Sequence, residues 1–252
     1  MTDENSLMIR KIALSFAMHA EANPIAERLG LSEPRILREG LPARIRTGRC
    51  GQIDIMLSTQ GIDPVHGVDR IGTESAALTA WVLAEEHEPD LLINAGTCGG
   101  FECRGGAVGK TYLAGGHFLY HDHLIPIPGF EQLGEGRIPV TPYGAIEELL
   151  AIESGPVSSG VSLTTNDQER AFFEREEVLA KDMEATAIAS VARDLTLPFM
   201  ALKTVTDLVD HPEPSQDAFQ RNLASSTQQL TDHLERLLRF LAEGRTLAEL
   251  SR

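Results

Sequence analysis

The chain has 252 residues, 42% of them hydrophobic, which is enough to bury a substantial core in one domain. Its 22 basic and 37 acidic side chains give a formal net charge of −15, which repels nucleic acid and anionic membrane surfaces and excludes both as expected partners. The three cysteines (Cys50, Cys98 and Cys103) form no Cys-x-x-Cys pair, so we expect neither a disulfide framework nor a zinc ribbon.

The amino-terminal residues carry acids where a signal peptide carries bases, and no apolar run approaches the ~18 residues that a membrane helix needs. We therefore expect a cytoplasmic protein. We also expect a single domain over residues 1–252, with a core at about 9–243 and a short tail at each end.

Strands and helices are predicted to alternate along the chain. The hydrophobic pattern predicts strands at 9–18, 53–57, 90–94, 109–120, 157–163, 179–183 and 199–208. It predicts helices from Pro24, at 74–87, at 143–152, after a capping box at Asn166 and Glu169, at 184–195 and at 215–243. This alternation is typical of an α/β fold.

Three acidic residues follow predicted strands and are candidates for chemistry. Glu184 stands at a strand-to-helix junction, where the helix amino terminus stabilises a carboxylate that can accept hydrogen bonds from two vicinal hydroxyls, unless it serves only as a first-turn acid that favours the helix. Asp207 ends an apolar strand; burial would raise its pKa and suit it to donate a proton, unless it is a structural acid that pairs with Lys203 or caps a turn. Glu21 follows the first strand and is able to activate water, although an acid in such a place is more often on the surface.

Two other patterns bear on ligands. The glycine-rich turn after Asn94 allows a ligand to approach the backbone, so Thr97 and the amides near Gly99 are candidates to bind a sugar or an anion. A cluster of metal-ligand residue types (His117, His121, Asp122 and His123) lacks an accompanying helical motif, which favours the polar rim of a pocket over a metal site. The segment 104–111 has Arg104 where a phosphate-binding P-loop requires glycine.

Four motifs together resemble the nucleoside phosphorylase and hydrolase family, in the same order along the chain. They are Ala17-Met18-x-Ala20-Glu21, Ile93 to Phe101, Asp182 to Ala187, and Val205-Thr206-Asp207, and the likeness covers about 12–230. His121-Asp122, the segment from Ile125 to Pro128, and Asn222 to Ser225 look most like the plant-type branch of the 5′-methylthioadenosine nucleosidases within this family.

This resemblance implies a single-domain three-layer αβα fold with a central mixed, twisted β-sheet. It also implies hydrolysis of the N-glycosidic bond of 5′-methylthioadenosine to adenine and 5-methylthioribose, with no cofactor and no metal. By matching positions, Asp207 would protonate N7 of the purine, Glu21 would position and activate the attacking water, and Glu184 would bind the 2′- and 3′-hydroxyls. The other matching positions are those for binding substrate: Thr97, Cys98, Gly99, Ser162, Leu163, Thr164, Met183, Lys203 and Thr206.

The family also implies a homodimer in which a loop containing His121, Ile125 and Pro126 completes the pocket of the partner subunit. The chain departs from the family pattern at Val161 and Leu163, which puts base recognition and the choice of 5′-substituent in doubt. Acceptance of S-adenosylhomocysteine stays open.

Other functions also stay open: a hydrolase or phosphorylase for another purine nucleoside such as futalosine, a non-catalytic nucleoside-binding protein, and a metal hydrolase using the histidine cluster. Among these the acid at Glu21 favours water over phosphate, because it repels an anion.

Overall fold

A mixed β-sheet organises residues 8–251, which are the part of the chain described by the computed structural model. The strand order is β10-β6-β8-β9-β5-β1-β4-β3-β2, with β7 pairing to β6. The strands are β1 (Lys11–Phe16), β2 (Arg35–Ile36), β3 (Arg44–Cys50), β4 (Ile53–Thr59), β5 (Leu91–Gly100), β6 (Thr111–Tyr120), β7 (Ile138–Pro139), β8 (Glu153–Ser159), β9 (Ala180–Asp182) and β10 (Phe199–Leu208).

The sheet is partly open and partly closed on itself. Strand β5 pairs in parallel with both β1 and β10, and β10 pairs antiparallel with β6. Since β6 pairs with β8, β8 with β9, and β9 with β5, these five strands form a barrel-like ring at one side of the molecule. The parallel strands β1, β5 and β10 end at one common edge, which brings the residues after them together.

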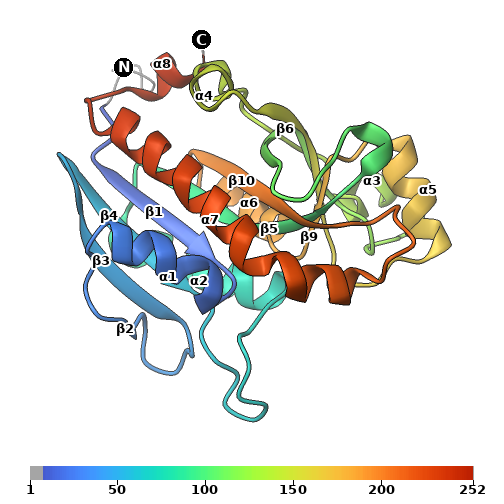
Figure 1. The fold of residues 1–252 in the computed structure, drawn as a ribbon, viewed down its shortest axis with the longest axis horizontal. Coiled ribbons are helices and arrows are strands. Elements are labelled where there is room, and N and C mark those ends of the chain that lie inside the picture. The colour runs from blue at the N-terminus through green and yellow to red at the C-terminus, as the bar shows by residue number, and fades with distance from the viewer. Residues whose placement is uncertain (1–7, 252) are drawn as a thin grey trace.

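Helices cover both faces of the sheet, as the sequence predicted. They are α1 (His19–Arg28), α2 (Thr73–His87), α3 (Glu131–Gly134), α4 (Gly144–Leu150), α5 (Asp167–Arg175), α6 (Ala185–Asp194), α7 (Ser215–Leu241) and α8 (Leu247–Leu250). In Figure 1 the long helix α7 lies across one face of the sheet with α1 beside it. Helices α2 and α6 pack against each other on the opposite face.

Alternate residues of a single strand pack into the two helical layers, because successive side chains of a strand point to opposite faces of the sheet. Leu14 of β1 belongs to the same apolar core as Leu234 of α7, whereas its neighbour Ala13 belongs to the core that contains Leu83 of α2. Both cores are apolar, and the three-layer αβα prediction with a mixed sheet is therefore confirmed.

Several predicted boundaries were wrong. Helix α1 begins at His19 instead of Pro24, so this proline lies inside the helix. Strand β8 ends at Ser159, four residues before the predicted end. Strand β5 continues to Gly100 through the segment that we expected to be a turn, because β10 and β9 hydrogen-bond to it there. The capping box of Asn166 and Glu169 at the start of α5 is confirmed.

Candidate active site

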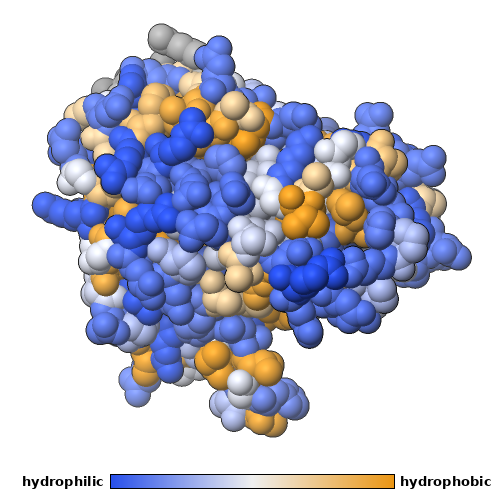
Figure 2. Space-filling view, in the orientation of Figure 1, coloured by the Kyte–Doolittle hydropathy of each residue, from blue (hydrophilic) through white to orange (hydrophobic). Residues whose placement is uncertain are grey.

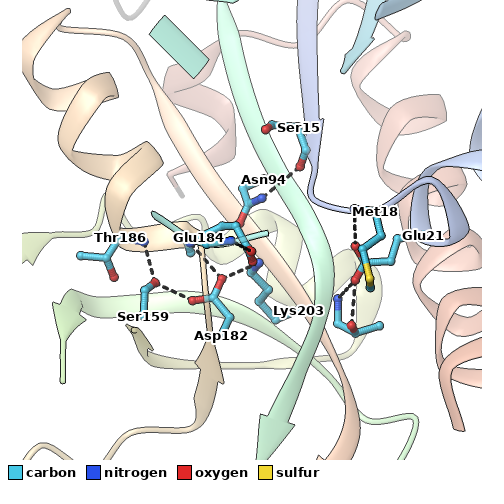
Figure 3. A network of polar contacts seen from close by, with 12 residues as sticks. Ser15, Met18, Glu21, Asn94, Ser159, Asp182, Glu184, Thr186 and Lys203 are labelled. Atoms are coloured by element: carbon cyan, nitrogen blue, oxygen red, sulfur yellow. Dashed lines mark hydrogen bonds and ion pairs between the residues drawn. The ribbon is translucent and has the colours of Figure 1, made fainter. Parts of the chain in front are cut away.

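Polar and charged side chains gather at the edge where β1, β5 and β10 end. Just below this edge, the side-chain amide of Asn94 on β5 donates to the carbonyl of Ser15 on β1 at 3.0 Å and ties the two strands together (Figure 3). Glu21, Glu184, Lys203 and Asp207 are all buried here. Buried charged groups require partners, and the partners of these four differ.

Glu21 lies in the first turn of α1 and is held at both of its oxygens. Oε2 accepts from the amide of Met18 at 3.2 Å, and Oε1 accepts from both the amide and the hydroxyl of Thr97 at 2.7 Å (Figure 3). Burial raises the pKa of Glu21, while the Thr97 bonds and the nearby charge of Lys203 oppose that rise. A carboxylate has about four acceptor positions, so these three bonds leave roughly one free for a ligand.

Glu184 occupies the N-cap position of α6, without a side-chain hydrogen bond to the helix, and lies at the same edge of the sheet. Its Oε1 accepts from the amide of Gly72, the residue that precedes α2, at 2.8 Å. Burial raises the pKa of Glu184 to about 7, and the charge of Asp182 adds to this effect. With this one hydrogen bond made inside the protein, the carboxylate keeps acceptor positions for two further donors.

Lys203 of β10 pairs with Asp182 and not with Asp207, which was the structural alternative that the sequence left open. Its Nζ lies 2.6 Å from Oδ2 of Asp182, and both side chains are almost fully buried. Burial lowers the pKa of Lys203, but the surrounding carboxylates of Asp182, Glu184 and Glu21 more than compensate and leave it raised. The ammonium is therefore a permanent positive charge among acids.

Asp207 lies farther along the same edge, beside Gly99 of β5. The hydroxyl of Thr206 donates to Oδ1 of Asp207 at 2.9 Å, and the side-chain amide of Asn222 on α7 donates to the carbonyl of Thr206 at 2.9 Å. Burial raises the pKa of Asp207, against the opposing effect of hydroxyls from Ser215 and Thr206. A carboxyl group with a raised pKa is suited to carry a proton.

Cys98 lies between these groups on β5. Its thiol is buried within electrostatic reach of Lys203, Asp207, Asp182 and Glu21, and burial raises its pKa well above the ordinary value. A neutral thiol is a small apolar surface and not a nucleophile. Met183 is half-buried next to Glu184, at the end of β9.

Ser162, Leu163 and Thr164 lie in an exposed loop and not at the end of a strand. Lys181 holds this loop: its Nζ donates to the carbonyls of Leu163 and Thr164 at 2.7 and 3.0 Å and to the Thr165 hydroxyl at 2.9 Å. The positive charge of Lys181 also reaches Asp207 and lowers its pKa. The loop is thereby tied near the proposed proton donor.

The predicted partner loop divides into buried and exposed residues. His121 is buried in its own subunit, where its Nδ1 lies 3.0 Å from the Ser158 hydroxyl and its ring meets the edge of Phe173. This burial argues against direct contact of His121 with a partner subunit. Ile125 is half-buried and Pro126 is exposed, so their predicted contact remains a prediction.

The histidine cluster does not converge on one point. His117 is exposed, His123 stacks on Tyr120, and burial lowers the pKa of His121 to about 4. Within residues 8–251, no three His, Cys, Asp or Glu side chains are arranged to hold a metal ion. In the same described range, no helix is long and apolar enough to cross a membrane.

Sequence reasoning missed several groups that build the site. Asp182 was read as part of a motif without a role, although a charged residue in a fully buried strand requires a buried partner. The amide of Gly72 and the ammonium of Lys181 were also missed. A backbone amide leaves no trace in a sequence pattern, and the contacts of Lys181 depend on where the loop after β8 folds.

Comparison with known proteins places this geometry in a family. The family model described as the phosphorylase superfamily matches residues 11–239. The chain is 34% identical over 244 residues to a 5′-methylthioadenosine nucleosidase of Arabidopsis thaliana, covering 96% of this chain and 91% of that protein. It is 30% identical to a 5′-methylthioadenosine/S-adenosylhomocysteine nucleosidase of the same plant, covering 96% and 95% of the two chains.

A solved structure agrees with these relatives. The apo structure of Arabidopsis thaliana 5′-methylthioadenosine nucleosidase superposes with a TM-score of 0.93, at 34% identity, over 96% of this chain and 100% of that chain. The chain belongs to the phosphorylase superfamily of nucleoside-cleaving α/β proteins. Within that family it is similar to the nucleosidases of the plant type, as the motif in the last helix predicted.

Proposed function

We propose that this protein hydrolyses the N-glycosidic bond of 5′-methylthioadenosine, giving adenine and 5-methylthioribose. The observation that carries the proposal is that Glu21, Glu184 and Asp207 are buried at one edge of the sheet in three different environments. The similarity to plant 5′-methylthioadenosine nucleosidases supplies the substrate class.

Cleavage of an N-glycosidic bond develops positive charge on the sugar and negative charge on the leaving base. Asp207, whose pKa is raised by burial, donates a proton to the purine nitrogen N7 and makes the base a better leaving group. Glu21 accepts a hydrogen bond from water at its remaining acceptor position and takes up a proton as the water attacks. Its negative charge also stabilises the cationic sugar before attack.

Glu184 fixes the ribose between these two acids. In its ionised form it accepts hydrogen bonds from the 2′- and 3′-hydroxyls, while the Gly72 amide holds its other side. Thr97, Cys98, Gly99 and Met183 line the sugar, and the loop of Ser162, Leu163 and Thr164 receives the base. Tight placement of the ribose converts the attack of water into an effectively intramolecular step.

We also propose that the protein works as a homodimer. Large apolar side chains are exposed on three segments: Val65, Val68 and Ile71 in the 61–72 loop, Leu124, Ile127, Phe130 and Leu133 in the 121–134 segment, and Val161 and Leu163 after β8. Figure 2 shows the projecting tip of the 61–72 loop with apolar side chains at its surface. A patch of this extent favours association, and a second copy of the chain is the occupant we propose.

The decisive experiment is the release of adenine from 5′-methylthioadenosine with and without phosphate, followed by mass spectrometry of both products. We expect equal rates in both buffers and free 5-methylthioribose as the sugar product. Strict dependence on phosphate would establish a phosphorylase instead, and absence of turnover with tight binding would establish a nucleoside-binding protein. Including S-adenosylhomocysteine and futalosine in the panel determines how far the 5′ pocket opens.

A further inference from the structure

The buried pair of Lys203 and Asp182 is difficult to explain as a source of stability. Both side chains are at most 1% exposed, and Nζ and Oδ2 are 2.6 Å apart. Removing two charges from water costs free energy that their attraction only partly returns, so an apolar pair of similar volume is often as stable. The position of this pair beside Glu184 and Glu21 points instead to a role in the site.

Asp182 is fixed by more than its ion pair. Its Oδ1 accepts from the Ser159 hydroxyl at 2.5 Å, and Oδ2 accepts from the Ala185 amide at 2.9 Å as well as from Lys203. The Ser159 hydroxyl in turn accepts from the Thr186 amide at 2.8 Å. Figure 3 shows this chain of contacts leading from the first turn of α6 to the Lys203 ammonium. With three bonds made inside the protein, Asp182 has little left to offer a substrate.

The ammonium of Lys203 faces the same small space as Glu21. A Cβ built on Gly96 of β5 would lie 3.3 Å from Oε1 of Glu21 and 3.6 Å from Nζ of Lys203. The bare glycine therefore leaves open the space that both groups approach. An ammonium has three donors, and the bond to Asp182 uses one of them.

We propose that Asp182 is a positioning residue of the hydrolytic reaction: it holds the Lys203 ammonium beside Glu21, so that the two groups share the attacking water above Gly96. The inference rests on the proposed function. Asp182 touches neither the water nor the nucleoside, and acts through Lys203.

The charge of Asp182 also reaches a defined set of titratable groups. These groups are Lys203, Glu184, Cys98, Tyr120 and His121. The pKa is about 12 for Tyr120, about 4 for His121 and well above the ordinary value for Cys98. Among the groups in this set, Glu184 with a pKa of about 7 is the one that titrates in the neutral range.

The direction of the pH effect follows from these charges. The negative charge of Asp182 raises the pKa of Glu184, so its removal lowers that pKa. Ionised Glu184 then persists to lower pH, and the acid limb of kcat/KM moves toward acid. The alkaline limb, which we assign to loss of the proton from Asp207, stays in place, since Asp182 is not among the groups that shift the pKa of Asp207. A role confined to folding would move neither limb.

The test is Asp182→Asn, which keeps the shape and removes the charge. We expect kcat for adenine release to fall about tenfold or more, KM to stay within about threefold, and the acid limb to move to lower pH. Asp90→Asn is the matched control, because Asp90 accepts from the amides of Arg10 and Lys11 at the opposite end of β1. This control is expected to retain kcat and both limbs.

A double-mutant cycle decides whether Asp182 acts through Lys203. Asp182→Asn combined with Lys203→Met is expected to have the same kcat as Lys203→Met alone. Additive losses, or an unchanged kcat in Asp182→Asn, would overturn the inference. If Asp182→Asn does not fold, Ser159→Ala replaces it, because this variant removes one hydrogen bond to Asp182 without changing any charge. The inference then requires a fall in kcat that is smaller than the one expected for Asp182→Asn. An unchanged kcat in Ser159→Ala would overturn it. Turnover by the unaltered protein is measured first, since its absence would instead refute the proposed function.

Discussion

Thr97 donates two hydrogen bonds to a single oxygen of Glu21, one from its amide and one from its hydroxyl, each 2.7 Å long. Both bonds favour the ionised carboxylate, and they oppose the rise in pKa that burial imposes on Glu21. Thr97 of β5 thus tunes the carboxylate that we propose as the base activating water. This relationship gives the first prediction.

Thr97→Val removes the hydroxyl bond and leaves the amide bond. The pKa of Glu21 is then expected to rise further, so that a smaller fraction of the base is ionised at neutral pH and the acid limb of kcat moves to higher pH. Thr97→Ser is the control, because it keeps the hydroxyl and is expected to keep the profile of the unaltered protein. A limb that stays in place in Thr97→Val would show that Glu21 does not limit the rate.

Asp207→Asn is expected to lower kcat by about 10²-fold to 10⁴-fold, the usual range for loss of a general acid. The melting temperature should change little, since asparagine can still accept from the Thr206 hydroxyl. Adenine release and thermal unfolding measured on the same preparation check both statements. Asp217→Asn, an exposed acid in the first turn of α7, is the control and should keep full activity. Retained turnover in Asp207→Asn would refute the assigned proton donor.

Glu184 makes stability depend on pH in a defined window. Its pKa is about 7 in the folded protein against 4.5 for the ordinary group, so the folded state keeps a proton that the unfolded state has lost. Between these two values stability therefore falls as pH rises, and above the folded pKa this contribution is gone. Glu184→Gln should flatten the fall in melting temperature over this window, by a few degrees.

Scanning calorimetry at about pH 5 and about pH 7.5 measures this difference for Glu184→Gln and for Glu148→Gln, an exposed acid on α4 that serves as the control. The same slope in the Glu184 variant and in the unaltered protein would contradict the assignment of a raised pKa to Glu184.

The apolar segment at 121–134 is expected to hold the dimer together. Leu133 is 66% exposed and Ile127 54% exposed, and a charge at either position would have to be buried in an interface. Leu133→Glu and Ile127→Glu should therefore shift the protein toward monomer in sedimentation velocity. Val108→Glu, at an exposed apolar residue on the loop before β6, is the control. A dimer that persists in both interface variants would place the interface elsewhere.

Chelation is expected to leave activity unchanged, because the proposed chemistry uses carboxyl groups and a buried ammonium. Exhaustive dialysis against a chelator, with the metal content checked by mass spectrometry, measures this. Loss of activity that returns with a divalent cation would restore the histidine cluster as a candidate catalytic site.

Strong periodic patterns allowed most of the fold to be predicted from the sequence. The apolar runs of β1, β5 and β10 and the spaced leucines of α7 leave few alternatives. Strand β3 was missed because its sequence Arg44–Cys50 is rich in arginine, and it lies near the open edge of the sheet where one face meets solvent. The shift of β8 has a similar cause, since Gly155 and Pro156 break the apolar pattern inside the strand.

The sequence predicted which acids lie at the edge of the sheet, but it did not predict which side chains pair with one another there. Glu21, Glu184 and Asp207 follow strands that the sequence identifies, so their common edge follows from a parallel arrangement. The partner of Lys203 does not, because Asp207 is four residues from it and Asp182 is far away in the sequence, and the ion pair with Asp182 depends on β9 and β10 both pairing with β5. Long-range pairs of this kind depend on the register of several strands at once.

The hydrogen bonds that Lys181 donates to Leu163, Thr164 and Thr165 have a thermodynamic consequence for ligand recognition. The loop that we propose receives the base is already held by these contacts in the folded chain, so a purine that enters later loses less affinity to immobilising it. In Lys181→Met, the loop would have to be ordered when the nucleoside binds, and the lost conformational entropy would weaken binding. This variant is therefore expected to have a lower kcat/KM for the nucleoside and a largely unchanged kcat.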